Sequence, residues 1–315
     1  MNIAILFPGQ GSQYLGMGSE FMTSSQECRR IMDITEEVCG APIATLCADG
    51  PMEELTRARN LQPAITAVNL MCWTMLKKAI EGRRQVRCLA GHSLGEYSAL
   101  HAAGVVSVEN TIRLVAERGA LMDREGQKNP GGMRAVLGLT VGEVEEIIAS
   151  CSDAGRVTAA NHNTEQQIVI SGDVKGLDQV GVVAEERGAK VIALNVSVAN
   201  HSPLVADAVP LFADFMKNIE FNQPQTPVYF NVSADTEDDV VKIKEMMAHQ
   251  IASRVRWFEI IQGMLAEGVD TFIEVGPKTV LKGMMRKIVP KGIRVTTLQF
   301  DTPEGLDTCL SSLED

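Results

Sequence analysis

A serine between two glycines is the strongest indication of chemistry in this 315-residue sequence. The motif Gly91-His92-Ser93-Leu94-Gly95 follows the apolar run 86–90 and precedes the helical pattern 96–103. Strand, sharp turn and helix are the context that a nucleophile elbow requires. Glycines on both sides leave room for the bend, and the helix directs its positive end toward the serine. Ser93 is therefore the candidate nucleophile, and a glycine-rich turn with an incidental serine is the alternative.

A nucleophilic serine needs a base, and the sequence offers five histidines: His92, His101, His162, His201 and His249. His92 adjoins Ser93 on extended backbone, so its side chain should point to the opposite face. His101 lies about 12 Å along the following helix, which is out of reach. His162 falls in a predicted insertion and His249 near a helix end. His201 precedes a Ser-Pro pair typical of a helix start, whose positive pole favours a neutral, proton-accepting imidazole, so His201 is the candidate base.

The segment FPGQGSQ, residues 7–13, follows the first apolar run and contains two glycines that allow close backbone approach to a ligand. A dinucleotide fingerprint does not fit, because Tyr14 takes the place of its third glycine, and the sequence contains neither a P-loop nor an H-E-x-x-H motif. An oxyanion-hole loop fits better. Such a loop supplies one backbone N–H, and the residue after the nucleophile, Leu94, supplies another.

Short apolar runs alternate with longer segments of helical period, which predicts an α/β fold with a mostly parallel sheet. The runs are residues 3–7, 86–90, 228–231, 271–275 and 295–298, and an amphipathic helix over 65–80 should pack on the sheet. Residues 130–197 follow the order βαββαβ of a ferredoxin-like unit, with linker chemistry before it. We predict a large domain, residues 1–129 and 198–315, with the subdomain 130–197 inserted into it. The cleft between them is the expected ligand site.

Composition narrows the class of protein. Lys and Arg total 29 against 40 Asp and Glu, and the net charge of −11 disfavours a nucleic-acid partner. The longest uncharged stretch, residues 60–76, is shorter than the roughly 20 apolar residues that cross a bilayer, and the first residues lack a signal-peptide pattern. The seven cysteines form no C-x-x-C pair. We therefore expect a cytoplasmic monomer without metal, cofactor or membrane attachment.

Five segments together resemble the malonyl-CoA:acyl carrier protein transacylase family, in its order and at its usual spacing over essentially the whole chain. They are PGQGSQ at 8–13, GHSLGEYSAL at 91–100, ERGALM at 117–122, SVANHSPL at 197–204 and IEVGPKTVL at 273–281. The resemblance implies an α/β-hydrolase-like large domain with an inserted ferredoxin-like subdomain. It also implies a ping-pong transfer of a malonyl group from malonyl-CoA to the phosphopantetheine thiol of an acyl carrier protein, in fatty acid synthesis. Transfer or hydrolysis of a different acyl group, in polyketide assembly, is the alternative.

Within this resemblance, Ser93 matches the acylated serine and His201 the base. The backbone N–H groups of Gln10 and Leu94 match the oxyanion hole. In this family a main-chain carbonyl orients the histidine in place of a carboxylate, and the matching residue is Gln250.

Arg118 matches the arginine that pairs the free carboxylate of the malonyl group. The assignment has its own physical logic, since a guanidinium binds a carboxylate through two parallel hydrogen bonds and keeps its proton. The alternative for Arg118 is a solvated helical arginine that balances Glu117.

A basic stripe is the candidate surface for an acidic carrier protein. Lys278, Lys282 and Arg286 recur at every fourth residue of a predicted helix. A solvated helix face is the alternative.

Three segments depart from the family pattern: 198–200 before His201, 161–166, and Arg134. The first borders the acyl group, so the identity of that group stays open, while Arg134 is expected at the surface. A serine hydrolase would need the same Ser93 and His201, and a non-enzymatic interaction module would need neither.

Overall fold

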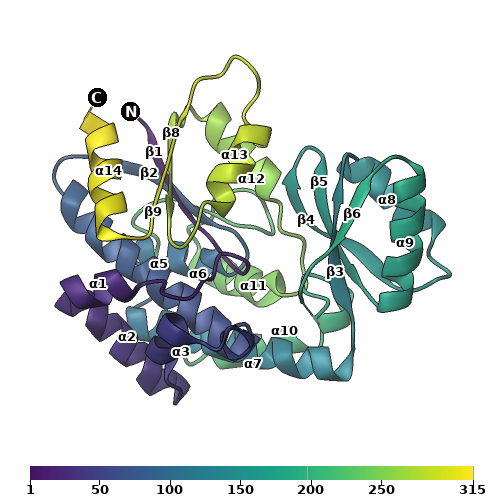
Figure 1. The fold of residues 1–315 in the computed structure, drawn as a ribbon, viewed down its shortest axis with the longest axis horizontal. Coiled ribbons are helices and arrows are strands. Elements are labelled where there is room, and N and C mark those ends of the chain that lie inside the picture. Colours follow the sequence, from purple (N-terminus) through teal and green to yellow (C-terminus); the bar gives the residue numbers. More distant parts are fainter. Residues whose placement is uncertain (197, 315) are drawn as a thin grey trace.

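Two separate sheets form the framework of the computed structural model, which describes residues 1–196 and 198–314 (Figure 1). The larger sheet has the order β7-β2-β1-β8-β9, and all its neighbours pair in parallel. Its strands are β1 (Ile3–Phe7), β2 (Val86–Gly91), β7 (Val228–Tyr229), β8 (Thr271–Val275) and β9 (Thr296–Phe300). The predicted parallel α/β body is confirmed.

Helices cover both faces of this sheet. They are α1 (Ser19–Ser24), α2 (Gln26–Cys39), α3 (Ile43–Asp49), α4 (Met52–Leu55), α5 (Ala58–Ile80), α6 (Gly95–Ala102), α7 (Val108–Lys128), α10 (Ala208–Met216), α11 (Val240–Gln250), α12 (Trp257–Ala266), α13 (Val280–Ile288) and α14 (Pro303–Glu314), with the short 3₁₀ turn η1 (Pro203–Val205).

The central strand β1 is buried along its whole length, as a parallel strand between two helical layers must be. Side chains alternate between faces. Ile5 and Phe7 join the core formed with α5, α6 and α7, whereas Ala4 and Leu6 join a second core formed with α12 and α13. Residues 60–73 of α5 are buried all round, because α2 and α7 pack on its outer side. The amphipathic pattern predicted there holds only for the last turns of α5.

The smaller sheet is antiparallel with the order β4-β5-β3-β6, which is that of a ferredoxin-like unit and confirms the prediction. Its elements are β3 (Gly132–Leu137), α8 (Val141–Ser150), β4 (Val157–Thr164), β5 (Gln167–Gly172), α9 (Val174–Glu186) and β6 (Lys190–Ala193). The domain boundaries 1–129, 130–197 and 198–315 stay a prediction, and residues 197 and 315, at two of these ends, lie outside the described residues.

The two faces of the smaller sheet have different neighbours. One face, with Val136, Ile168 and Ile170, packs on α8 and α9. The other face carries Met133 and Val169, which line a cavity next to the larger sheet. Strand β4 joins the two parts, since the His162 N–H donates to the Val255 carbonyl and the Val255 N–H donates to the Ala160 carbonyl, each at 2.8 Å. The smaller sheet therefore forms one wall of that cavity.

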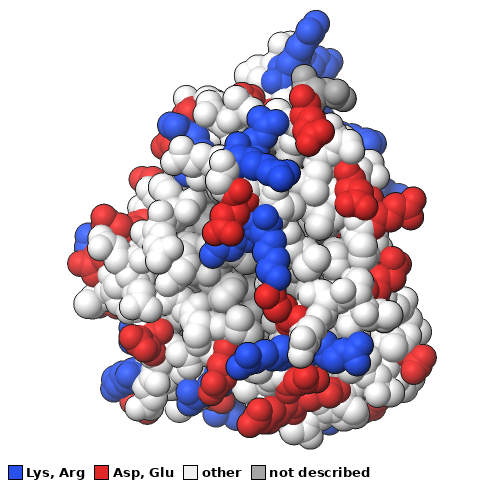
Figure 2. All heavy atoms as spheres, turned by 90° about the vertical axis from the view of Figure 1, so that its left-hand side faces the viewer, with Lys and Arg blue, Asp and Glu red and all other residues white. Residues whose placement is uncertain are grey.

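Charge is mixed on the surface face that Figure 2 presents, where Lys and Arg are interspersed with Asp and Glu. Within residues 1–196 and 198–314, no helix has the length and apolar run needed to span a bilayer.

Candidate active site

A tight bend between β2 and α6 presents Ser93. The serine has a φ of 52°, a left-handed conformation that is uncommon outside glycine. A Cβ on Gly91 would lie 1.9 Å from the carbonyl carbon of Gly95, and a Cβ on Gly95 would lie 2.0 Å from the Phe7 carbonyl oxygen. Only glycine fits at either position, so the predicted strand, turn and helix around Ser93 are confirmed.

His201 lies directly against this serine. The Ser93 Oγ and His201 Nε2 atoms are 2.7 Å apart. On the other side of the ring, Nδ1 lies 2.9 Å from the Gln250 carbonyl oxygen and 3.0 Å from that of Ser253. Because carbonyl oxygens only accept hydrogen bonds, Nδ1 carries the proton and Nε2 is left as the acceptor that faces the serine hydroxyl.

The neutral state of His201 has a different cause from the one predicted. Burial lowers the pKa of the imidazole to about 3, with the positive charge of Arg118 acting in the same direction. The expected helix start is only the three-residue turn η1, in which Ser202 Oγ accepts from the Leu204 N–H. So short a turn has little dipole. The helix-dipole explanation is wrong, although the predicted acceptor is in place.

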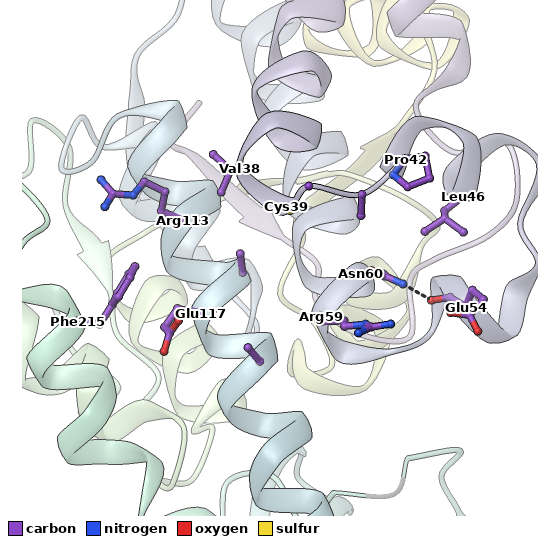
Figure 3. Close-up of a pocket in the computed structure, with 14 residues that line it drawn as sticks. Val38, Cys39, Pro42, Leu46, Glu54, Arg59, Asn60, Arg113, Glu117 and Phe215 are labelled. Atoms are coloured by element: carbon purple, nitrogen blue, oxygen red, sulfur yellow. Dashed lines mark hydrogen bonds between the residues drawn. The ribbon is translucent and has the colours of Figure 1, made fainter.

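Arg118 is buried, with 1% of its surface exposed. Its Nη2 donates to Ser93 Oγ at 3.2 Å and to Gln250 Oε1 at 3.1 Å, while Nη1 donates to Gln62 Oε1 at 2.9 Å. All three acceptors are neutral, and no carboxylate of the described residues is hydrogen-bonded to this cation. Glu117 lies on the other side of α7, so the alternative of a solvated arginine balanced by Glu117 is wrong (Figure 3).

The loop after β1 packs on the elbow. A Cβ on Gly9 would lie 2.5 Å from the His92 carbonyl oxygen and 3.4 Å from the Leu94 nitrogen. The next residue, Gln10, lines the same cavity as Ser93 and Leu94. Within the described residues, neither the Gln10 nor the Leu94 backbone N–H donates to a protein acceptor. Both are therefore free to donate to a ligand.

These groups surround a cavity of about 160 Å³. Both parts of the chain line it, since Met133 and Val169 come from the smaller sheet and Leu281 from α13. A groove of about 420 Å³ shares Gln10 and Asn200 with this cavity and continues it. A larger cavity, of about 700 Å³, lies behind α7 and is lined by none of Ser93, His201 and Arg118 (Figure 3). The site thus occupies the predicted position between the two parts.

Comparisons with known proteins identify the family of this chain. Residues 5–298 match the model of the acyl transferase domain. The malonyl CoA-acyl carrier protein transacylase of Bacillus subtilis (strain 168) is 36% identical over 315 residues, which cover 99% of this chain and 98% of that one. The chain belongs to the malonyl CoA-acyl carrier protein transacylase family. The predicted resemblance is therefore confirmed.

Solved structures of this family have the same fold. An acyl carrier protein S-malonyltransferase from Vibrio cholerae superposes with a TM-score of 0.92 at 36% identity and covers 98% of this chain and 100% of that one. A malonyl-transacylase in complex with a type II PKS acyl-carrier protein superposes with a TM-score of 0.94 at 32% identity, over 99% of this chain and 100% of that one.

Three of the other histidines, His92, His101 and His162, have partners of their own. His92 Nε2 lies 2.7 Å from Asn163 Oδ1, with its ring against Trp257, and His92 lines the same cavity as Ser93. His101 Nδ1 lies 3.0 Å from the Val106 carbonyl oxygen. Within the described residues, no cluster of His, Cys, Asp or Glu is suited to hold a metal ion.

His162 and Arg134 also stand apart from Ser93. His162 Nδ1 lies 3.1 Å from Glu259 Oε1. Arg134 pairs with Asp178 at the surface, in line with the expectation for that residue.

Sequence reasoning missed three polar residues of this site. Glu96, fully buried in α6, accepts from the Gln250 side chain and from the Asn231 backbone. Asn231 Oδ1 accepts from the Ser93 N–H at 2.7 Å. Gln62 holds Arg118 from α5. The one available signal was Glu96 itself, a charged residue in an otherwise apolar helix directly after the elbow.

Proposed function

We propose that this chain transfers a malonyl group from coenzyme A to the phosphopantetheine thiol of an acyl carrier protein through an acyl-enzyme at Ser93. One observation carries the proposal. The Ser93 hydroxyl lies 2.7 Å from a neutral imidazole nitrogen and 3.2 Å from a buried guanidinium. His201 can activate the serine oxygen as a base, and the Arg118 guanidinium beside it can bind the free carboxylate of the malonyl group.

The reaction has two matching halves. His201 Nε2 takes the proton of Ser93 while Oγ attacks the thioester carbonyl, and the oxyanion is held by the Gln10 and Leu94 N–H groups. The C–S bond then breaks, and His201 returns the proton to the coenzyme A thiolate. In the second half, the carrier thiol gives its proton to His201 and its sulfur attacks the acyl-serine carbonyl. The ester C–O bond then breaks, and His201 returns the proton to the Ser93 oxygen. Losing one oxyanion donor would cost about 3 to 4 kcal/mol of transition-state stabilisation.

Gln250 has two roles in this proposal. Its carbonyl, with that of Ser253, fixes the His201 tautomer, and its side chain holds both Ser93 and Arg118. No carboxylate contacts the imidazole ring among the described residues, and the main-chain carbonyls take the orienting role.

For the carrier protein we propose docking at α13, because Val280 and Leu281 of this helix line the cavity. Lys282 and Arg286 lie on α13, but Lys278 precedes it with a φ of 62°. The predicted three-residue stripe is therefore wrong at Lys278, and the basic surface reduces to the other two residues.

We also propose that the chain acts in fatty acid synthesis, in the cytoplasm and as a monomer. All seven cysteines are free, which suits a reducing compartment. The similarity to a malonyl-transacylase in complex with a type II PKS acyl-carrier protein makes polyketide assembly the second candidate pathway.

The experiment is a transfer assay with malonyl-CoA and a holo-carrier protein. We expect malonyl-carrier to form with little free malonate, because a hydrolase would pass the acyl group to water. Equal release of malonate with and without carrier would contradict transfer.

A further inference from the structure

A buried carboxylate beneath the elbow has no part in the reaction described above. Glu96 lies on α6 one turn after Ser93, and none of its surface is exposed. Its Oε2 accepts from Gln250 Nε2 at 2.6 Å, and its Oε1 accepts from the Asn231 N–H at 2.7 Å. A buried carboxylate is retained only where such donors compensate for its desolvation.

Both partners of Glu96 hold the backbone of Ser93. Asn231 Oδ1 accepts from the Ser93 N–H at 2.7 Å, and Gln250 Nε2 also donates to the Ser93 carbonyl at 2.7 Å. Ser93 needs this support because its φ of 52° is strained for a residue with a side chain. Glu96 therefore holds Asn231 and Gln250 in place, and these two residues bind the N–H and the carbonyl of the strained Ser93.

Gln250 also connects this carboxylate to the base and the cation. Arg118 can only donate, so Gln250 Oε1 faces it, whereas the Ser93 carbonyl and the Glu96 carboxylate accept, so Nε2 faces them. The backbone carbonyl of the same Gln250 accepts from His201 Nδ1. One glutamine thus touches the nucleophile, the base and the cation, and Glu96 sets its orientation.

We propose that Glu96 is a positioning residue, which fixes Gln250 and Asn231 and through them the relative placement of Ser93, His201 and Arg118. The inference rests on the proposed function. The substitution Glu96→Gln tests it, because an amide has one acceptor and one donor end. Whichever way that amide turns, its NH₂ group meets Gln250 Nε2 or the Asn231 N–H, both of which are donors. Gln250 cannot compensate by turning, because its oxygen would then face the Ser93 carbonyl.

The measurement is the single-turnover rate at which malonyl-CoA acylates Ser93, in the full chain. We expect Glu96→Gln to slow acylation about tenfold to a hundredfold, since small displacements of reacting groups have effects of this size. The preference for malonyl-CoA over acetyl-CoA should fall as well, because Gln250 no longer holds Arg118. A purely structural role would leave that ratio unchanged.

The matched control is Glu125→Gln. Glu125 is also a buried carboxylate, with 1% exposure, and it accepts from Arg124 on α7 without lining the cavity. We expect this variant to acylate within about twofold of the parent and to show a melting temperature close to that of Glu96→Gln.

Parent-like acylation by folded Glu96→Gln would overturn the proposal, and so would equal slowing in Glu125→Gln. If Glu96→Gln does not fold, Glu96→Asp decides, because the shortened carboxylate can reach only one partner. Slower acylation then supports the proposal, and the parent rate overturns it. A parent chain that never forms malonyl-Ser93 would instead refute the proposed function and leave no role for Glu96 to explain.

Discussion

Replacing Arg118 by methionine should remove the discrimination between malonyl-CoA and acetyl-CoA. Arg118 is 1% exposed, and its guanidinium donates to neutral groups of Ser93, Gln62 and Gln250 and lies over the Tyr97 ring. The free carboxylate of malonyl-CoA would give Arg118 a directly bound negative partner. Removing one partner of a buried ion pair costs about 3 to 5 kcal/mol. At about 1.4 kcal/mol for each factor of ten, the parent should prefer malonyl-CoA by a hundredfold or more.

The assay compares kcat/KM for the two thioesters in the parent, Arg118→Met and a control. Methionine keeps an unbranched side chain but carries no charge. Loss of the hydrogen bonds from Arg118 to Gln62 and Gln250 affects the reactions of malonyl-CoA and acetyl-CoA alike. The ratio of the two kcat/KM values therefore isolates the contact between Arg118 and the carboxylate. We expect that ratio to fall below about ten in Arg118→Met.

Arg113→Met is the matched control for this prediction. Arg113 lies on the same helix α7 but lines the large cavity on its other side (Figure 3). This variant should keep the parent preference. An unchanged preference in Arg118→Met would refute the assignment of Arg118 to the carboxylate.

Three further predictions concern the base, the elbow and the carrier surface. The pKa of His201 is about 3 in the folded chain, whereas an unfolded histidine gains a proton below about pH 6.5. Acidification from about pH 7 to 5 should therefore lower the free energy of unfolding of the parent more than that of His201→Gln, as measured by urea titration. Equal pH dependence would contradict this. Gly95→Ala should destabilise the fold by about 3 kcal/mol or more, because its Cβ would meet the Phe7 carbonyl oxygen. Gly142→Ala, at an exposed position of α8 with nothing near the added Cβ, should stabilise the fold by about 0.5 to 1 kcal/mol in the same titrations. A mild effect in Gly95→Ala would refute the packing argument. Charge reversal of Lys282 and Arg286 to glutamate should raise the KM for carrier protein about tenfold and leave acylation of Ser93 by malonyl-CoA intact. An unchanged KM for carrier protein would exclude docking on α13.

The elements around Ser93 could be predicted because local signals specify them. The apolar runs that become β1, β2 and β8 end at glycines or proline, and the tight approach at Gly91 and Gly95 leaves only glycine as a solution. Such signals need nothing from distant parts of the chain. The nucleophile and its elbow therefore follow from the sequence pattern.

Strand β4 shows where local pattern is insufficient. The polar residues 161–164 lack the apolar side chains that indicate a strand. The strand continues to Thr164, because β5 pairs with it and Val255 of the larger part bonds to His162. Polar side chains fit there because Asn161 and Asn163 point into the cavity, not into an apolar core.

The polar support of the site could not be predicted from spacing. Hydrogen bonds join Glu96 to Asn231 and to Gln250 across 135 and 154 positions of the chain, and of these three residues only Gln250 was predicted, from the family resemblance. Hydrogen-bond complementarity of this kind leaves no period in the sequence. The cause of the neutral state of His201 was missed for the same reason, since it depends on burial and on Arg118 in three dimensions.

The most direct test is the intact mass of the chain after brief incubation with malonyl-CoA, with Ser93→Ala and His201→Ala alongside. Because the serine oxygen lies 2.7 Å from His201 Nε2, we predict that the parent gains the mass of one malonyl group, that Ser93→Ala gains none and that His201→Ala gains it at least about a hundredfold more slowly. Full labelling of Ser93→Ala, or parent-rate labelling of His201→Ala, would contradict this account.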